Sequence, residues 1–203
     1  MKRETLLKIE ELIKKYGAKS LERVTSDKTF LKIETYKVEL NNGEVIYRDK
    51  LIKNGGNGNA CVIVPLVNEN QVLMVVQPRV FTHLTAQLDF PAGYLDNNED
   101  HKLAAIRELL EETGYKAKEM KEVAYYYQDE GVGNARNKVF IASGLEKVCE
   151  VSLDEDEYLE SILVDIDDIE ELMELGYIAS GGARIGYDEL MLDKYKKLLG
   201  KGK

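Results

Sequence analysis

The chain has 203 residues, a length that suits one domain, or one domain with a small appendage. Hydrophobic residues make up 44% and charged residues 32% of it, as in a soluble globular protein with an apolar core. The net charge of −9 argues against nonspecific binding to a nucleic acid backbone, which requires a basic surface, although cations would still let an acidic protein act on an anionic substrate.

The first part of the chain predicts a helix followed by a hairpin. Residues 3–16 place leucine and isoleucine side chains on one helical face, and Gly17 is a natural stop. Residues 30–52 alternate in polarity on either side of the turn signal Asn42-Gly43. Charges interrupt every apolar stretch of the opening segment, so it does not resemble a signal peptide.

Several strand-like segments and further helices follow. The strands are "ACVIVPLV", "QVLMVVQPR", "EVAYYYQDE", "NKVFIASGL" and "ESILVDI", and helices are expected in "DIDDIEELMELG" and "YDELMLDKYKKLLG". This order predicts an α+β or mixed α/β sandwich rather than a regular βαβ series. "ACVIVPLV", the longest uncharged apolar run, is too short to span a membrane. Cys61 and Cys149 lack the spacing of metal ligands, so we expect reduced thiols and a cytoplasmic protein.

Another helix is predicted at residues 101–113, and its acids raise a question. Its leucine and isoleucine side chains would face the core, while the opposite side would carry three acids and two alanines that leave space over them: Glu108, Glu111, Glu112, Ala104 and Ala105. Like charges one turn apart destabilise a helix by roughly 0.2–0.5 kcal/mol per pair, and acids in its C-terminal half oppose the helix dipole. Either the acids are merely solvated, or a divalent cation offsets their repulsion.

The spacing around this helix resembles a known motif. Gly93 is followed after five residues by Glu99 and after seven more by "RELLEETGY", residues 107–115. This matches the Nudix box, GX5EX7REUXEEXGU with U a bulky apolar residue, at every fixed position, with Tyr115 as the loosest fit. The chain therefore resembles the Nudix hydrolases, and the resemblance implies a mixed α/β/α Nudix sandwich with a small N-terminal helix and antiparallel β-sheet as an appendage.

The resemblance implies a role for each matching residue. Metal ions would be bound by three side chains and one backbone carbonyl, those of Glu108, Glu111, Glu112 and Ala92. The other box residues would brace the loop against the helix or form turns: Gly93, Glu99, Arg107 and Gly114. Mg²⁺ is the expected cofactor, with Mn²⁺ as the alternative.

Beyond the box, residues 30–180 follow the running order of ADP-ribose pyrophosphatases, from "VELNNGEVIYRDKLI" through "PAGYLD" to "DEDEYLESILVDI". In that branch the N-terminal strands form a small sheet that pairs with a partner subunit. We therefore expect residues 1–55 to be a helix and hairpin that mediate homodimerisation, and residues 56–203 to be the Nudix hydrolase domain. Asp89 and Phe90 depart mildly from the usual Glu-Leu-Pro-Ala-Gly of the branch.

The resemblance also implies a general base outside the box, on a loop after the strand that ends in "ASGL". Glu157 aligns best, Glu155 is second and Glu160 third, and Glu111 within the box is a further catalytic candidate. Consecutive acids on a loop are often only solvated, so a catalytic role and a merely solvated loop are equal alternatives for this segment.

Substrate contacts are expected from Arg79, Gln128 and Arg136. Arg79 matches an arginine near the adenine site of the branch, but Pro78 replaces the tyrosine before it, and a solvated charge at a strand end is an equal alternative. Gln128 and Arg136 could contact ribose or phosphate. The tyrosines 125–127 could stack on a base or pack in the core, and strand alternation would split them between two faces.

The expected reaction is Mg²⁺-dependent hydrolysis of the pyrophosphate bond in a nucleoside diphosphate linked to a group X, with ADP-ribose giving AMP and ribose 5-phosphate. A water deprotonated by Glu157 would attack one phosphorus. The alternatives are another nucleotide sugar, a dinucleotide or a damaged nucleotide as substrate, a noncatalytic ADP-ribose-binding sensor, or an acidic structural protein. The complete set of box acids and the lack of a basic domain favour the enzyme. The expected partner is a nucleoside diphosphate sugar, with no nucleic acid and no membrane.

Overall fold

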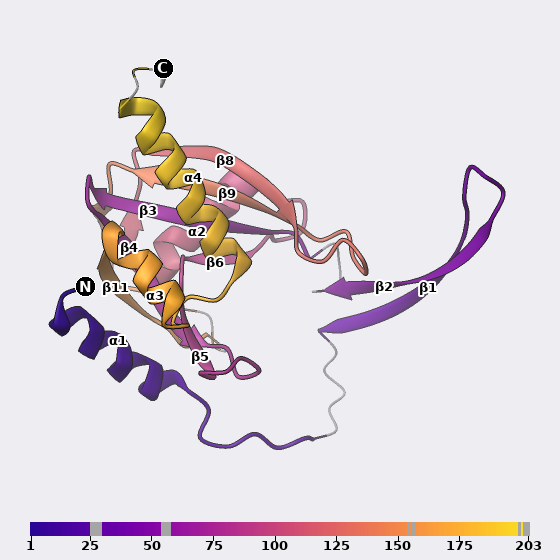
Figure 1. Ribbon diagram of the computed structural model, residues 1–203, viewed down its shortest axis with the longest axis horizontal. Coiled ribbons are helices and arrows are strands. Elements are labelled where there is room, and N and C mark those ends of the chain that lie inside the picture. Colours follow the sequence, from indigo (N-terminus) through magenta and orange to yellow (C-terminus); the bar gives the residue numbers. More distant parts are fainter. Residues whose placement is uncertain (25–29, 54–57, 154, 156, 199, 201–203) are drawn as a thin grey trace.

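The computed structural model describes residues 1–24, 30–53, 58–153, 155, 157–198 and 200. It is an α/β/α sandwich with a hairpin that projects from the body (Figure 1). The predicted α+β class with an N-terminal antiparallel appendage is confirmed. Within the described ranges, no helix is both long and apolar enough to cross a membrane.

The helices are α1 (Arg3–Tyr16), α2 (His101–Thr113), α3 (Ile169–Glu174) and α4 (Gly181–Leu198), with the short 3-10 helix η1 (Ile166–Asp168) before α3. The longer strands are β1 (Leu31–Glu39), β2 (Val45–Lys53), β3 (Ala60–Asn68), β4 (Gln71–Pro78), β8 (Glu119–Tyr127), β9 (Arg136–Ser143) and β11 (Glu160–Asp165). The short strands are β5 (Ala86–Asp89), β6 (Ala92–Tyr94), β7 (Tyr115–Lys116) and β10 (Glu146–Lys147). The last helix begins earlier than the expected "YDELMLDKYKKLLG", because Gly181 and Gly182 belong to its first turn.

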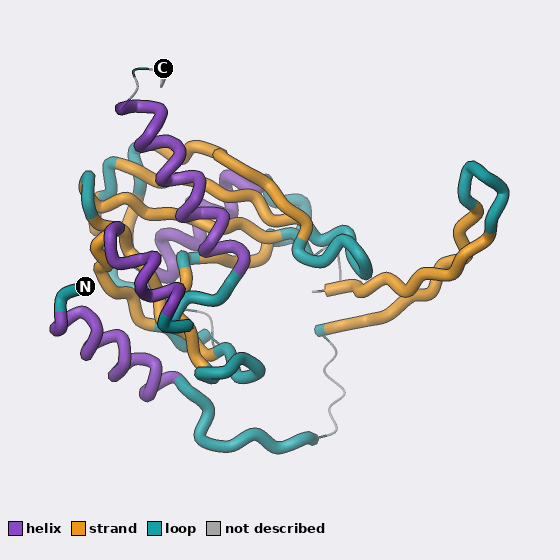
Figure 2. The backbone as a smooth tube through the Cα atoms, viewed as in Figure 1, coloured by secondary structure: helices purple, strands orange, loops and turns teal. Residues whose placement is uncertain are grey.

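A mixed sheet of order β11-β4-β3-β9-β8 forms the middle layer, with β5 added to β4 and β6 to β3 (Figure 2). The central pair β3–β9 is parallel, and its neighbours in the sheet are antiparallel. Side chains alternate along β3, so Val62 and Val64 join the main core with α1, α3 and α4, while Cys61 and Ile63 join a smaller core with α2. Helices therefore cover both faces of the sheet.

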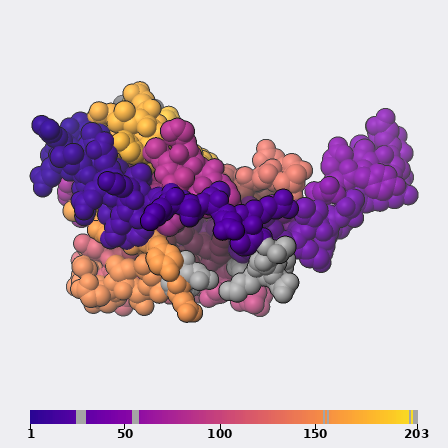
Figure 3. Space-filling model, turned by 90° about the horizontal axis from the view of Figure 1, so that it is seen from below, coloured from indigo at the N-terminus to yellow at the C-terminus, as the bar shows by residue number. Residues whose placement is uncertain are grey.

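The N-terminal helix packs into the body, and the hairpin extends away from it. Ile9 and Leu12 of α1 are buried in the main core, and Figure 3 shows the chain after α1 running from the helix in the direction of the hairpin. Strands β1 and β2 pair along their whole length around the expected turn. The expected domain boundary at residues 55–56 lies within 54–57, outside the described residues.

The orientation of α2 corrects the prediction of its faces. Ala104 and Ala105 are both 0% exposed, whereas Leu103 and Ile106 are 60% and 42% exposed. The alanines therefore do not leave space above the acids. They pack against β3 and β9, and their small side chains let the helix approach the sheet closely.

The C-terminal end of α2 depends on the conformation of Gly114, which a substitution can test. It has a φ of +75°, and a Cβ there would collide with the backbone carbonyl of Cys149. Gly176 has a φ of +80° but no atom near the position of a Cβ. We predict that Gly114→Ala lowers the free energy of unfolding by about 3 kcal/mol and Gly176→Ala by about 1 kcal/mol, because only the first adds a collision to the left-handed strain. Urea unfolding measures both, and equal losses would contradict the prediction.

Candidate active site

The site forms where the loop after β6 meets α2. The side chain of Asp100 caps the helix by accepting a 2.8 Å hydrogen bond from Lys102 N. Gly114 ends the helix in the left-handed conformation and donates to the Leu110 carbonyl. Both ends of α2 are thus fixed, and the side chains of its last turns are held against the sheet.

The guanidinium of Arg107 joins the loop to the helix. It donates to the two carboxylate oxygens of Glu99 at 3.1 and 3.0 Å, and to the Tyr94 carbonyl at 3.0 Å. Its Nη1 donates to Glu108 at 2.8 Å and to Glu111 at 2.9 Å. Hydrogen bonding to Arg107 lowers the pKa of Glu99. This is the geometry that a brace between loop and helix requires.

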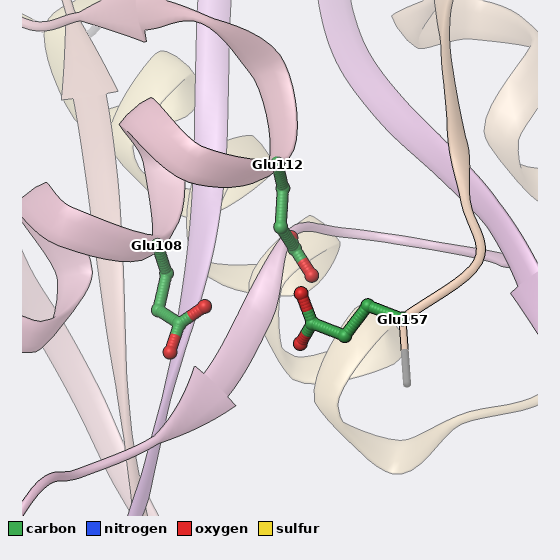
Figure 4. Close-up of side chains that lie close together, drawn as sticks. All are labelled: Glu108, Glu112 and Glu157. Atoms are coloured by element: carbon green, nitrogen blue, oxygen red, sulfur yellow. The ribbon is translucent and has the colours of Figure 1, made fainter. Parts of the chain in front are cut away.

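Three glutamate carboxylates converge next to this brace (Figure 4). One oxygen from each of Glu108, Glu112 and Glu157 lies within 4.8 Å of the other two. Glu108 and Glu112 come from adjacent turns of α2 and are 5% and 2% exposed, while Glu157 reaches in from the loop before β11 and is more exposed. A Cβ at Gly93 would collide with the Glu108 carboxylate, so a glycine is needed for β6 to pass this close.

Burial opposes the charges of the two helix carboxylates. It raises the pKa of Glu108 to about 7, against the opposing pull of Arg107. Burial also raises the pKa of Glu112 well above its usual range, and the charges of Glu108 and Glu157 raise it further. One compensating hydrogen bond reaches Glu112 from Ala92 N at 3.1 Å. Such a cluster is stabilised either by protons or by a cation.

Comparison with known proteins establishes the family. The NUDIX domain model matches residues 57–180. The chain belongs to the Nudix family of pyrophosphohydrolases. It is similar to an ADP-ribose pyrophosphatase of Bacillus subtilis strain 168, with 35% identity over 138 residues that cover 68% of this chain and 72% of the relative. It is also similar to a GDP-mannose pyrophosphatase of Salmonella paratyphi B, with 33% identity over 116 residues that cover 54% of this chain and 60% of the relative.

A solved structure shares the fold. It is the crystal structure of an ADP compounds hydrolase, which superposes with a TM-score of 0.72 at 20% identity and covers 91% of this chain and 100% of that one. At this level of identity the likeness concerns the Nudix fold alone. It agrees with the sandwich and the mixed sheet described above.

The carboxylates line a cleft of about 870 Å³, and two of the three expected substrate residues line it as well. Arg79 and Gln128 face this cleft. Among the described residues Arg136 is not part of its wall; its guanidinium carbon lies 5.6 Å from the centre of the Tyr125 ring. The structure therefore brings Arg79 and Gln128, but not Arg136, next to the Nudix carboxylates.

Gln128 bridges neighbouring segments of the chain. Its Nε2 donates to the Gly58 carbonyl at 2.8 Å and to Asn137 Oδ1 at 2.7 Å. Its Oε1 accepts a 2.7 Å hydrogen bond from Lys53 Nζ at the end of β2. Both amide hydrogens are thus engaged, which leaves only the carbonyl oxygen to face a ligand.

The other acids selected from the sequence lie apart from the converging three. Glu111 is held by Arg107 and is not part of the cluster. Glu155 is exposed on the loop. Glu160 is bonded to Lys15 of α1 at 2.7 Å. Of the three candidates on or beside this loop, Glu157 alone joins the Nudix glutamates within the described residues.

Sequence reasoning missed polar residues that also line the cleft: Asp89, Asn137 and Ser180. Tyr126, for which base stacking and core packing were both left open, lines the cleft as well. Asp89 is 7% exposed, and its Oδ1 accepts hydrogen bonds from Ser180 Oγ at 2.8 Å and Phe90 N at 2.9 Å. Burial raises the pKa of Asp89. The one feature of the sequence that pointed to this wall was Asp89 itself, which stands where the branch usually has glutamate. Tyr126 is partly buried between the exposed Tyr125 and Tyr127, as the expected strand alternation requires.

The raised pKa of the buried Glu108 predicts that the free energy of unfolding depends on pH. Since its folded pKa of about 7 exceeds the ordinary 4.5, its contribution to stability is present in full below pH 4.5 and is lost as the pH rises through 7. In metal-free buffer we predict that this group removes about 3 kcal/mol from the free energy of unfolding over that window, and that Glu108→Gln abolishes this part of the loss. Denaturant titrations at several pH values measure it, with Glu155→Gln as the exposed control. The same pH slope in Glu108→Gln and in the unmodified protein would contradict the prediction.

Proposed function

We propose that the protein catalyses Mg²⁺-dependent hydrolysis of the pyrophosphate bond of a nucleoside diphosphate linked to a group X, with ADP-ribose as the best substrate. The observation that carries this proposal is the convergence of Glu108, Glu112 and Glu157 in the cleft. The similarity to an ADP-ribose pyrophosphatase supports the choice of substrate.

The residues of the cluster fit a divalent cation. Glu108 and Glu112 are buried and have raised pKa values, and among the described residues Arg107 donates to Glu108 but not to Glu112. The carboxylate oxygens of Glu108 and Glu112, together with the carbonyl of Ala92, whose N–H donates to Glu112, would form an all-oxygen donor set of the kind that Mg²⁺ prefers and Mn²⁺ accepts. Glu111 stays available as a further ligand if Arg107 releases it.

Each residue has a task in the proposed reaction. Glu108, Glu112 and the Ala92 carbonyl would hold Mg²⁺, which when bound would neutralise the phosphates and polarise the bond to be cleaved. Glu157 would take the proton of the attacking water as general base. The hydroxide oxygen would bond to one phosphorus while the bridging oxygen leaves with the other phosphate, so ADP-ribose and water give AMP and ribose 5-phosphate. Arg79 would bind the nucleotide within the cleft.

A second nucleotide sugar is the alternative substrate. The similarity to a GDP-mannose pyrophosphatase favours it. In either case the same carboxylates would act on the same bond. A noncatalytic sensor is disfavoured because each acid of the Nudix box is present and two of them meet the loop glutamate.

Both cysteines are free thiols, which supports a cytoplasmic location.

Two substitutions separate the metal ligand from the base. We predict that Glu112→Gln and Glu157→Gln each lower kcat about 10²- to 10⁴-fold. Raising the Mg²⁺ concentration should restore part of the activity of Glu112→Gln, because it weakens metal binding, and none in Glu157→Gln. Release of AMP from ADP-ribose is the measurement, and Glu155→Gln on the same loop is the matched control. Full Mg²⁺-dependent turnover by Glu112→Gln would overturn the proposal.

The hairpin β1–β2 is the proposed dimerisation element of the N-terminal region 1–55. A two-stranded hairpin alone is marginally stable in water, and this one presents Ile33 and Tyr47, 68% and 64% exposed, on the same face. Leu31 and Val45 extend that face. A second copy that covers these side chains would stabilise the hairpin and form a homodimer.

The apolar face of the hairpin gives a direct test of the dimer. We predict that the double substitution Ile33→Lys and Tyr47→Lys shifts the protein from dimer to monomer, since it places charges in the buried centre of the interface. Arg48→Ala, on the other face, should leave the dimer intact. Sedimentation velocity at micromolar concentration distinguishes the states. Monomeric behaviour of the unmodified protein would exclude the proposed dimer.

A further inference from the structure

A polar face on strands β4 and β5 lies in the cleft beside the Nudix carboxylates. Residues that pair directly share a face, and Val75 pairs with Asp89 while Gln77 pairs with Gln87. Strand alternation therefore places Gln77 and Asp89 on one face as diagonal neighbours. The opposite face carries Val76 and Leu88, both in the main core. Gln77 and Asp89 both line the cleft.

Asp89 presents a hydrogen-bond acceptor that the protein does not use. Both hydrogen bonds to its carboxylate, from Ser180 Oγ and Phe90 N, end on Oδ1. Among the described residues no donor reaches Oδ2, and this oxygen is not one of the fully buried side-chain atoms, so it is open to the cleft. A carboxylate oxygen that faces a cleft without a protein donor is placed to accept a hydrogen bond from a ligand.

Two donors lie on the same wall. Gln77 Nε2 is buried and has no hydrogen-bond partner among the described residues. The Tyr126 hydroxyl accepts a 2.6 Å hydrogen bond from Asn137 Nδ2, which leaves its own hydrogen to donate. The wall therefore offers one acceptor and two donors.

The start of α4 keeps these groups in place. Ser180 Oγ accepts from Ala183 N at 3.0 Å while it donates to Asp89, so the first turn of the helix orients the carboxylate. A Cβ at Gly182 would lie 2.7 Å from the Tyr126 hydroxyl oxygen. A glycine at this position lets the tyrosine approach the helix. The sequence "SGGA" thus fixes both the acceptor and one donor.

Sugar hydroxyls match this pattern, whereas phosphate does not. A hydroxyl donates and accepts at once, so two neighbouring hydroxyls can satisfy Asp89 Oδ2 and the two donors together. Phosphate oxygens only accept, and a carboxylate repels them. We propose that Asp89, Gln77 and Tyr126 form a subsite that binds the vicinal hydroxyls of a substrate sugar and makes Asp89 a specificity-determining residue. This inference rests on the proposed nucleotide-sugar substrate.

Asp89→Asn tests the acceptor with little change of shape. Asparagine keeps Oδ1 for Ser180 and Phe90 N but replaces the second oxygen by a donor. We expect Kd for ADP-ribose to rise about 10- to 100-fold, because a buried hydrogen bond is replaced by two opposed donors. Tyr126→Phe should weaken binding of the same ligand. Calorimetry in Ca²⁺ buffer measures binding without relying on turnover, and thermal unfolding checks that both variants fold.

Ligands that lack one sugar group locate the contact. The methyl ester of ADP has no terminal sugar, and the 2′-deoxyadenosine analogue of ADP-ribose lacks one hydroxyl of the nucleoside ribose. The Asp89→Asn effect should be strong for ADP-ribose and nearly vanish for one of these two, which identifies the sugar that is bound. If Asp89→Asn loses the same affinity for all three ligands, Asp89 contacts the base or only supports the fold. If it loses affinity for none of them, Asp89 does not contact the ligand. Either result overturns the subsite.

The proposed reaction is tested separately with the unmodified protein. Failure to release AMP from ADP-ribose in Mg²⁺ would refute the hydrolysis. The difference between ligands in the binding measurements would still decide whether the sugar subsite exists, because it does not depend on turnover. The two proposals therefore fail on different measurements.

Discussion

The guanidinium of Arg107 is the contact on which the active site depends. It donates to Glu99 and the Tyr94 carbonyl on the loop side and to Glu108 and Glu111 on the helix side. Charge-assisted hydrogen bonds of this kind hold planar groups in fixed relative positions. Without this cation, the loop after β6 would have no ionic tie to α2, and the burial of Glu108 would lack its one positive neighbour in the described structure. The brace is thus both a mechanical and an electrostatic requirement.

The same contact divides the box glutamates into two groups. Arg107 holds Glu111 at the rim, while Glu108 and Glu112 turn into the cleft, where Glu157 completes the cluster. Folding thereby places like charges together and withdraws two of them from water, which destabilises the ionised apo protein. Binding of a cation to such a cluster releases protons and stabilises the fold, so metal affinity and stability are linked through the same carboxylates. Two buried carboxylates that meet a third in a cleft are more informative about function than the acidic sequence alone.

Much of this arrangement could be predicted, and the failures have definite physical causes. The hairpin, the N-terminal helix and the α/β/α sandwich follow from turn chemistry, periodicity and the resemblance to the Nudix box. The faces of α2 could not be assigned from size and hydrophobicity, because Ala104 and Ala105 pack closely on the sheet while Leu103 stays exposed. The start of α4 was missed because Gly181-Gly182 is typical of a loop, and with it the contact between Ser180 and Asp89, which lie far apart in sequence. Pairings of this kind depend on tertiary structure and leave no periodic signal.

The cleft wall also connects the substrate side of the protein to its appendage. Lys53 at the end of β2 donates to Gln128, Gln128 donates to Asn137, and Asn137 donates to Tyr126, with donor–acceptor distances of 2.7, 2.7 and 2.6 Å. Each side chain in this series is hydrogen-bonded to the next. A displacement of Lys53 at the root of the hairpin would therefore change the position of the Tyr126 hydroxyl in the cleft. The hairpin is therefore held by the same hydrogen bonds that orient the cleft wall. This gives a physical reason why an exposed two-stranded element and a hydrolytic site would belong to one protein: in the proposed dimer, covering the apolar face of the hairpin would also steady the donors of the proposed sugar subsite.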